Sequence, residues 1–243
     1  MARNRKSTAA PARGRAAARW LSPRRVVRGL WRGLFVLVVL VVALVALFGQ
    51  VTPPPGPYII SERLRLGGIE REWVPMERIS PHMARAAVAA EDANFCLHWG
   101  FDMVELRRAI DAGARRGAST ISQQTVKNVF LWQGRSWGRK ALEALLTPVM
   151  EATWSKRRIL EVYLNVAEFD TGVFGVEAAA RHYFGVSAAD LTLTQAARLA
   201  AILPDPRGRS ASNPSAFVQR RSGAIADGAA TIARDGRAAC FGG

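Results

Sequence analysis

The sequence predicts a mostly α-helical domain with a small β element, preceded by one N-terminal transmembrane helix. Three observations predict this class. Residues 33–51 are almost entirely apolar, residues 58–75 alternate in an extended pattern, and from Ile79 onward apolar residues recur at helical spacing between capping residues. A chain of 243 residues with 49% hydrophobic content can bury the core of one globular domain, which excludes a disordered chain.

The formal net charge of +15 is concentrated in an N-terminal tail. Residues 1–32 contain ten Lys or Arg and no acidic residue, and the remainder carries 24 basic against 19 acidic residues. A balance of only +5 outside the tail gives no reason to expect nucleic-acid binding.

Residues 33–51 are predicted to span a membrane. About 19 residues at roughly 1.5 Å per residue nearly cross a hydrocarbon core of about 30 Å, and Trp20 and Trp31 precede the run. A cleavable signal peptide is the alternative, but its apolar region is usually shorter, and no convincing small-x-small cleavage site follows. The arginines before the span place residues 1–32 in the cytoplasm and everything after Val51 in the periplasm or outside the cell.

Residues 52–72 are expected to form a linker with a short extended segment. Apolar and polar residues alternate here, and the Gly67-Gly68 pair suggests a small hairpin or an irregular strand pair. The globular domain is then expected over residues 73–235, and residues 236–243 are expected to be disordered.

The domain itself is expected to be almost entirely helical, because capping residues recur along it. Ser80 followed by Pro81 predicts an N-cap with proline at the first helical position, opening a helix that delivers Glu91. Further helices are expected from Asp102 to about residue 114, from Ser119 or Thr120 to 130, over 139–154, from Ser155 to 165, and over 176–183, 191–202 and about 214–233.

The stretch EDANFCLHWGFD, residues 91–102, concentrates side chains that can do chemistry. The alanine-rich segment before it should be helical, so Glu91 falls near a helix C-terminus, where the dipole disfavours another negative charge. A half-apolar setting beside Phe95 would also raise the pKa of the Glu91 carboxyl, which suits a general base near neutral pH. The alternative is that Glu91 and Asp92 are a surface pair that caps a helix or forms a salt bridge.

His98 is expected to be a hydrogen-bonded structural residue. No second histidine lies within metal-ligand reach, because His82 and His182 are distant in sequence, so we do not expect a metal site. Cys96 and Cys240 lack metal-ligand spacing too. They could pair in an oxidising compartment or remain two unpaired thiols.

The segment GASTISQQTVKN, residues 117–128, predicts an anion site. A helix N-terminus with hydroxyl groups, followed by a lysine one to two turns on, can hold a phosphate. The alternative is an ordinary exposed polar helix. The polar residues concerned are Ser119, Thr120, Gln123, Gln124, Lys127 and Asn128.

A second group of charged residues consists of two cations, Arg139 and Lys140, followed one turn later by a carboxylate, Glu143. The simplest interpretation is an i,i+4 ion pair on a solvated helix face. The functional interpretation is a second carboxylate flanked by phosphate-binding cations. Lys156 and Glu161 in the next helix present the same ambiguity.

The segment VFLWQGRSWG, residues 129–138, is too short and glycine-broken for a core helix. Aromatic residues beside an arginine are typical of a membrane interface. We therefore expect a loop that dips into the bilayer interface.

Taken together and in this order, these motifs resemble those of the peptidoglycan glycosyltransferase family, the transglycosylase module of class A penicillin-binding proteins. EDANFCLHWGFD is similar to the first motif of that family, GASTISQQTVKN to the second, RKALE to the third and KRRILEVYLN to the fourth. AAARHYFG followed by AARLAAILPDP is similar to its fifth region. The resemblance covers residues from about 73 to 206.

The resemblance implies a lysozyme-like helical fold and polymerisation of lipid II, an undecaprenyl-diphosphate-linked disaccharide-pentapeptide, into β-1,4-linked glycan strands. Glu91 would be the base that deprotonates the acceptor 4-hydroxyl for an inverting attack, and Glu143 would assist at the donor. The remaining site residues implied are Lys127, Arg139 and Lys140 for the diphosphate, Ser119, Thr120, Gln123, Gln124, Asn128 and Glu161 for the cleft, and Asp92, Phe95 and His98 as supports.

The chain departs from the family pattern at two places. Asp170-Thr171 stands where Gly-Pro is usual, and Gln195 stands where an acid is common, which puts the local loop geometry in question. No Ser-x-x-Lys, Ser-x-Asn or Lys-Thr-Gly motif occurs, so the chain resembles the monofunctional type without transpeptidase activity.

The resemblance also implies a location and partners. The expected location is the bacterial cytoplasmic membrane, with the catalytic domain in the periplasm. The expected partners are lipid II, the growing glycan chain and the membrane. Cell-wall synthesis or division proteins, and a divalent cation such as Mg²⁺ or Mn²⁺, are left open. The rival hypotheses are a glycan-cleaving muramidase and a non-catalytic membrane scaffold.

Overall fold

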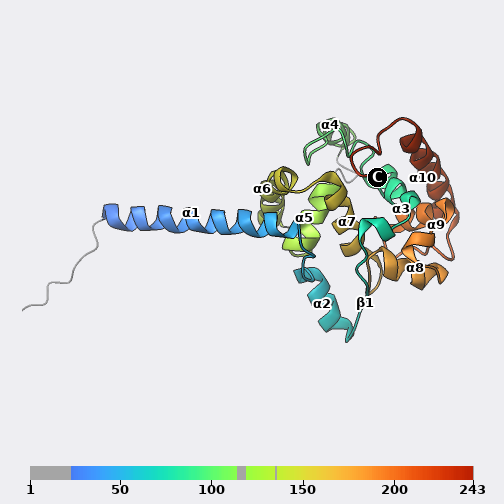
Figure 1. Ribbon diagram of the computed structural model, residues 1–243, viewed down its shortest axis with the longest axis horizontal. Coiled ribbons are helices and arrows are strands. Elements are labelled where there is room, and N and C mark those ends of the chain that lie inside the picture. Colours follow the sequence, from blue (N-terminus) through green and yellow to red (C-terminus); the bar gives the residue numbers. More distant parts are fainter. Residues whose placement is uncertain (1–22, 114–118, 135, 243) are drawn as a thin grey trace, which may run out of the picture. The chain divides into compact units, whose positions relative to one another are not determined.

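The computed structural model describes residues 23–113, 119–134 and 136–242 (Figure 1). Most of the predicted basic tail 1–32, the helix break at Gly117 and Arg135 of the aromatic loop lie outside the described residues. The chain divides into one unit that ends at Val41 and a second unit from Val42 onward. Each unit is described by itself.

Helix α1 runs from Pro23 to Phe48 and contains residues 33–48 of the predicted span 33–51. Within the described residues, Arg24–Phe48 is the one helix long and apolar enough to cross a membrane. Its apolar side chains are largely exposed, as a surface that faces lipid requires. The helix begins earlier than the apolar run, because the basic residues before it continue the same helix.

The prediction of extended structure from Tyr58 onward is wrong for its first part. Helix α2, Pro57–Leu66, occupies it, with proline in its first turn and Gly67 in the left-handed conformation at its C-terminus (φ 73°). Ile59 and Glu62 are buried three residues apart, which is a helical spacing. The Gly67-Gly68 pair therefore ends a helix and closes no hairpin.

The small β element predicted from the sequence is present, but its strands come from distant segments. Strand β1, Glu70–Arg71, pairs in parallel with β3, Val173–Phe174, and β3 pairs antiparallel with β2, Glu168–Asp170. The strand order is β1-β3-β2. Gly172, with φ 77°, makes the tight return between β2 and β3.

Two groups of helices build the rest of the second unit (Figure 1). Helices α3 (Pro81–Glu91), α9 (Leu193–Ile202) and α10 (Ala216–Arg234) pack on one another, and α5 (Ile121–Phe130) packs on α6 (Trp137–Thr153) and α7 (Lys156–Val166). The remaining elements are α4 (Met103–Asp111), α8 (Val176–Phe184) and the short 3-10 helices Met76–Arg78 and Ala188–Asp190.

Small residues allow the first group to pack closely. Alanines of α3 and α9 are buried where these helices meet, among them Ala86 and Ala200. Gly228 of α10 lies against Ala89 of α3, where an added Cβ would come within 3.2 Å of the alanine methyl. The alanine-rich composition noted in the sequence therefore serves helix packing as well as helix propensity.

The predicted capping residues begin the helices of the domain. Their side chains accept hydrogen bonds from the backbone N–H groups of the first turn, as the sequence pattern requires. The predicted caps that the structure confirms are Ser80, Asp102, Thr120 and Ser155. Three further helices begin at caps that the sequence analysis did not predict, Ser136, Thr192 and Ser215.

The expectation that residues 236–243 are disordered is wrong for the described residues up to 242. Cys240 forms a disulfide with Cys96 of the central stretch. Phe241 is buried beside Phe95, with ring centroids 6.2 Å apart, and its carbonyl accepts a hydrogen bond from Arg157 Nη1. A covalent bond and a buried ring fix this segment, and neither partner is close in sequence.

Candidate active site

Glu91 is the last residue of α3 and its side chain is 12% exposed. Burial raises the pKa of its carboxyl above the ordinary value. Gln124 Nε2 donates to Glu91 Oε2 over 3.0 Å, and Arg221 Nη2 lies 3.9 Å from Oε1; both contacts favour the charged form and limit the rise. The net result is a carboxyl that keeps its proton to a higher pH than a free glutamate and still faces a donor that orients it.

Asp92 ties the central stretch to the start of α5. Its Oδ1 lies 2.8 Å from His98 Nε2, and its Oδ2 accepts from the backbone N–H of Ile121. Thr120 Oγ1 donates to the carbonyl of Gly100, whose φ is 82°. A Cβ at Gly100 would come within 2.5 Å of a Thr147 methyl, so the motif needs glycine here. These contacts agree with a structural role for His98.

Three potential metal ligands, on Asp92, His98 and Asp102, lie within 4.8 Å of one another. Both oxygens of Asp92 are already hydrogen-bonded. Asp102 Oδ1 accepts from two backbone N–H groups at the start of α4, and its Oδ2 accepts from Asn94 Nδ2. A divalent cation would have to displace these bonds, so the donor set fits a scaffold better than an Mg²⁺ or Mn²⁺ site.

The N-terminus of α5 uses two of its predicted site residues for capping. Thr120 and Gln123 form a capping box in which each side chain accepts from the other's backbone N–H. Gln124, the next residue, is free to reach Glu91. The first turn of the helix therefore uses two polar side chains to cap its own start and directs a third, that of Gln124, to the site.

Lys127 follows one turn after Gln123, and its ammonium group is close enough to both Glu91 and Glu143 to feel their negative charges. Burial lowers the pKa of its ammonium group, and the negative charges of Glu143 and Glu91 act in the opposite direction. Among the described residues, no side chain or carbonyl hydrogen-bonds its Nζ. A partly buried cation without such a bond is suited to bind an anion.

Glu143 stands on the first turns of α6 and is 2% exposed. Arg139 Nη1 lies 2.9 Å from Glu143 Oε2, and Lys140 Nζ pairs with Oε1. Lys140 Nζ also donates to Ser119 Oγ over 3.1 Å. The pairing expected on a solvated face is therefore part of a partly buried cluster that joins α6 to the segment before α5.

The structure thus brings most of the expected site residues to one place, around the starts of α5 and α6 and the end of α3. Phe95 is fully buried, with Lys156 Nζ 4.5 Å from its ring centroid, which fits a support. Asn128 accepts from Gln133. Glu161 has other contacts: its Oε2 accepts from the backbone N–H of Met76 and its Oε1 pairs with Arg158.

Sequence reasoning missed Arg221. It is on α10, far along the chain from Glu91, and its guanidinium approaches the Glu91 carboxylate and the carbonyl of Ala90. The sequence pattern of α10 indicates only an amphipathic helix. No local signal marks one of its arginines, because the packing of α3 on α10 selects it.

Comparisons with known proteins agree with the motifs. The family model described as "Transglycosylase" matches residues 60–230. A protein of Jannaschia sp. (strain CCS1) named "Biosynthetic peptidoglycan transglycosylase" is 64% identical over 88% of this chain and 90% of its own length. Proteins of the same name from Rhodospirillum centenum (strain ATCC 51521 / SW) and Caulobacter vibrioides (strain ATCC 19089 / CIP 103742 / CB 15) are 50% and 47% identical, each over 89% of this chain and 96% and 97% of their own lengths.

The family match covers the whole site described above, from Glu91 to Arg221, as well as most of α2 and the small sheet. The mostly helical domain with its small sheet and N-terminal apolar helix agrees with the fold class that the sequence predicts. The chain belongs to the transglycosylase family of enzymes.

Proposed function

We propose that this protein polymerises lipid II into β-1,4-linked glycan strands and releases undecaprenyl diphosphate. One observation carries the proposal. A carboxyl with a raised pKa, Glu91, lies near the partly buried cation Lys127, whose ammonium group is in turn close to the charges of Arg139 and Lys140. A base and an anion-binding group are the two components that glycosyl transfer from a diphosphate needs. The name shared by the relatives supports peptidoglycan as the product.

In this mechanism, Glu91 takes the proton of the acceptor 4-hydroxyl as that oxygen attacks the anomeric carbon of the donor. The new glycosidic C–O bond forms while the bond from the anomeric carbon to the diphosphate oxygen breaks, with inversion. The electron pair leaves on undecaprenyl diphosphate. The raised pKa of Glu91 makes its carboxylate a stronger base than that of a free glutamate.

The cations act on the leaving group. Negative charge grows on the diphosphate in the transition state, and positioned cations in a partly buried site stabilise it strongly. Lys127 is the best placed of them, since it has no hydrogen-bond partner among the described residues. Glu143 holds Arg139 and Lys140 in place and assists at the donor.

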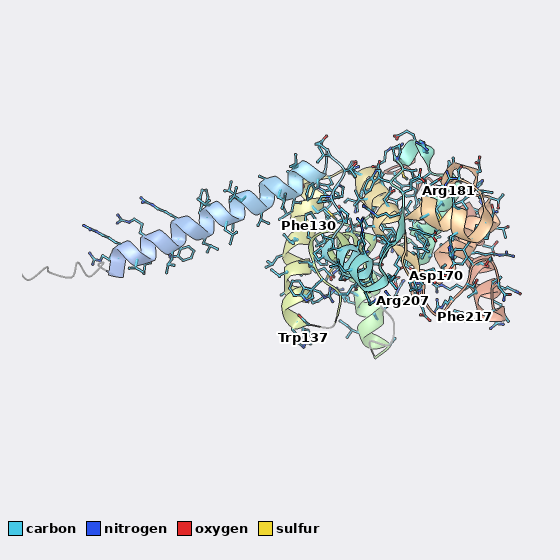
Figure 2. The ribbon with its side chains drawn as sticks, turned by 90° about the horizontal axis from the view of Figure 1, so that it is seen from below. Phe130, Trp137, Asp170, Arg181, Arg207 and Phe217 are labelled. Atoms are coloured by element: carbon cyan, nitrogen blue, oxygen red, sulfur yellow. A yellow bond between two sulfur atoms is a disulfide. The ribbon has the colours of Figure 1, made fainter. Side chains whose placement is uncertain are left out.

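The membrane location belongs to the same proposal. Helix α1 anchors the chain in the cytoplasmic membrane with its N-terminus in the cytoplasm, and the domain works in the periplasm. Trp137, 92% exposed at the start of α6 (Figure 2), and Trp132, 47% exposed, lie in the loop predicted to enter the bilayer interface. A lipid-linked donor would meet the site there. The same proposal includes the absence of transpeptidase activity.

Incubating the purified full-length protein with labelled lipid II tests the proposal, with and without a chelator to settle the need for a divalent cation. We expect glycan polymer from the native protein and none from Glu91→Gln. Shortening of preformed glycan would instead establish a muramidase. Equal behaviour of the native protein and Glu91→Gln, with neither product formed, would favour a non-catalytic scaffold.

A further inference from the structure

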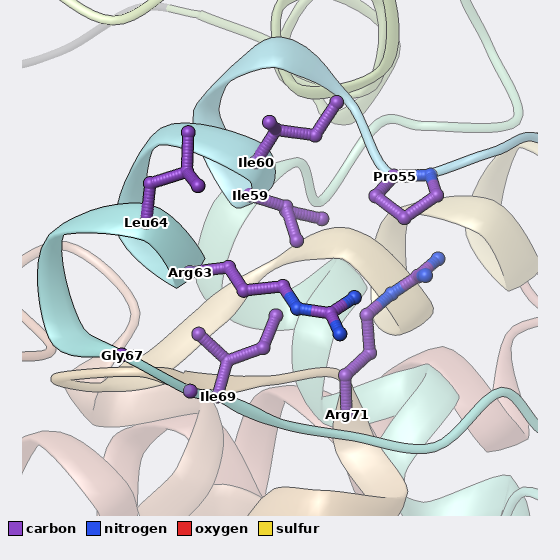
Figure 3. A pocket seen from close by; sticks show the side chains of 9 residues that line it. Pro55, Ile59, Ile60, Arg63, Leu64, Gly67, Ile69 and Arg71 are labelled. Atoms are coloured by element: carbon purple, nitrogen blue, oxygen red, sulfur yellow. The ribbon is translucent and has the colours of Figure 1, made fainter.

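A cavity of about 590 Å³ lies apart from the catalytic residues, between α2 and the chain that leads into β1. Its wall is mainly apolar, and Figure 3 shows two guanidinium groups, of Arg63 and Arg71, directed into it. The lining residues are Pro55, Ile59, Ile60, Arg63, Leu64, Gly67, Gly68, Ile69 and Arg71. An apolar wall with a cationic end is suited to an amphiphilic anion.

The turn at Gly67 and the pairing of β1 place both arginines at the cavity. Gly67 ends α2 in the left-handed conformation, which turns the chain back so that Ile69 and Arg71 run beside the helix. The pairing of Arg71 with Phe174 in the sheet fixes the arginine in place. Its Cζ also lies 5.9 Å from the ring centroid of Trp73.

Within the described structure, no carboxylate lies within salt-bridge distance of Arg71. Its Nε and Nη2 are buried, and neither has a hydrogen-bond partner there. The described residues likewise offer Arg63 no carboxylate within salt-bridge distance. Buried guanidinium donors cost stability unless an acceptor satisfies them, and here a second cation faces the same cavity. An anion from outside the chain would satisfy these donors.

Residues near the cavity contact the end of α1, the proposed membrane anchor. Arg158 donates to the carbonyls of Phe48, at the end of α1, and Val51, and its Cζ lies 5.6 Å from the same Trp73 ring. A chain of contacts therefore runs from Arg71 in the cavity to Trp73, from Trp73 to Arg158, and from Arg158 to the residues where the predicted span ends. Ile60 and Leu64 on its wall are 49% and 79% exposed, which leaves an apolar surface open beside the arginines.

We propose that this cavity binds an anionic phospholipid of the surrounding membrane leaflet, with its phosphate between Arg63 and Arg71 and an acyl chain along Ile59, Ile60 and Leu64. Guanidinium groups bind phosphate through paired N–H donors, which satisfies the orphaned donors of Arg71. The bound lipid would hold α2 and β1 at a fixed depth beside the anchor. The proposal is independent of the reaction at Glu91.

Native mass spectrometry of the detergent-solubilised full chain tests this proposal. Palmitoyl-oleoyl phosphatidylglycerol and phosphatidylcholine are compared as matched anionic and neutral probes. We expect phosphatidylglycerol to bind more tightly, and Arg63→Gln and Arg71→Gln to weaken it about tenfold each, the usual effect of a lost charged hydrogen bond. Arg220→Gln, which removes an exposed arginine of α10, is the control for general charge loss, since the arginines of α1 also attract anionic lipid.

Two further variants separate lipid binding from a structural role. Without lipid, Arg71→Gln should keep or raise the melting temperature, because it removes a desolvated charge. A lower melting temperature would mean that Arg71 merely supports the fold. Leu64→Ser changes only an exposed wall residue and should weaken phosphatidylglycerol binding several-fold without any change in the binding of inorganic phosphate.

Three outcomes would overturn the proposal. Equal binding of phosphatidylglycerol and phosphatidylcholine would show that the arginines do not distinguish an anionic lipid from a neutral one. Binding of inorganic phosphate as tight as that of the lipid would mean that the apolar wall contributes nothing. Tighter binding of farnesyl diphosphate at the same arginines would assign the cavity to prenyl diphosphates instead.

Discussion

Glu91 and Glu143 are both buried glutamates of one site, yet their surroundings differ. Glu91 has an amide, Gln124, at 3.0 Å and a single guanidinium at 3.9 Å, and burial raises its pKa. Glu143 is in direct contact with two cations, Arg139 and Lys140. A carboxyl with weak compensation can exchange a proton, whereas one in contact with two cations can hold them in position. The difference supports the proposed roles of Glu91 as the base and of Glu143 as the organiser of the cation cluster.

The largest expected effect comes from Glu91→Gln, which removes the base and keeps the shape. We expect the rate of lipid II polymerisation to fall about 10³-fold or more, within the range for loss of a general base. The melting temperature at neutral pH should not fall, because the change replaces a desolvated carboxyl by a neutral group. A polymerisation assay and a thermal melt on the same sample measure both.

Glu143→Gln should instead affect activity and stability together. It leaves Arg139 and Lys140 without their carboxylate, and Lys140 is partly exposed, so we expect a loss of about 1–3 kcal/mol in the free energy of unfolding. Activity should fall about 10- to 100-fold as the cations lose their positions. Denaturant unfolding measures the first effect. If Glu143→Gln had a free energy of unfolding as high as that of Glu91→Gln, the distinction between the two carboxylates would be contradicted.

Replacing Cys96 and Cys240 together by serine tests whether the stretch that contains Glu91 and Cys96 depends on its covalent link to the C-terminal segment. The disulfide closes a loop of 144 residues, so its loss should lower the free energy of unfolding by about 2–5 kcal/mol. Activity at a temperature where the variant is folded should change only a few-fold. The pairing of Arg139 with Glu143 should be unaffected, so an added Glu143→Gln change should cost the same in both backgrounds.

Arg221→Gln should give the smallest effect, a shift in the pH profile. The base must be ionised, so activity rises with pH through the folded pKa of Glu91, which lies above the ordinary glutamate value. Arg221 lowers that pKa, so its loss should move the acid limb to higher pH and leave the plateau rate nearly unchanged. The pH dependence of kcat/KM measures it, and Arg220→Gln is the matched control on the same helix.

The same pKa shift has a consequence for stability. Because folding raises the pKa of Glu91, the protonated carboxyl is favoured in the folded state. Its contribution to stability is present below the unfolded pKa of a glutamate and is lost as the pH rises through the folded value. Glu91→Gln should remove this part of the pH dependence. An unchanged stability profile would mean that burial does not control this carboxyl.

Local chemistry allowed much of the fold to be predicted from the sequence. Ser80, Asp102, Thr120 and Ser155 cap helices where a short polar side chain precedes an apolar repeat, and that signal spans only a few residues. The same holds for the apolar helix that ends at Phe48, since length and hydropathy suffice to define it.

Helix α2 carries local signals, a proline in its first turn and Gly67 at its end, which the alternating pattern of residues 58–75 obscures. The other failures of prediction involve contacts between distant residues. The partner of β1 lies about a hundred residues away in β3. The pairing of Cys96 with Cys240 and the burial of Phe241 were equally invisible, since they depend on where α3, α7 and the C-terminus meet.

By itself, the sequence determined the apolar N-terminal helix, the helical domain with several of its caps, and the residue types that can supply a base and an anion site. Only the tertiary structure decided which of them meet. It put Gln124 and Arg221 beside Glu91, held Arg139 and Lys140 on Glu143, and left two guanidinium nitrogens of Arg71 without a hydrogen-bond partner among the described residues. The reason is physical: helix caps and hydropathy act over a few residues of chain, whereas desolvation and charge pairing depend on distances in space.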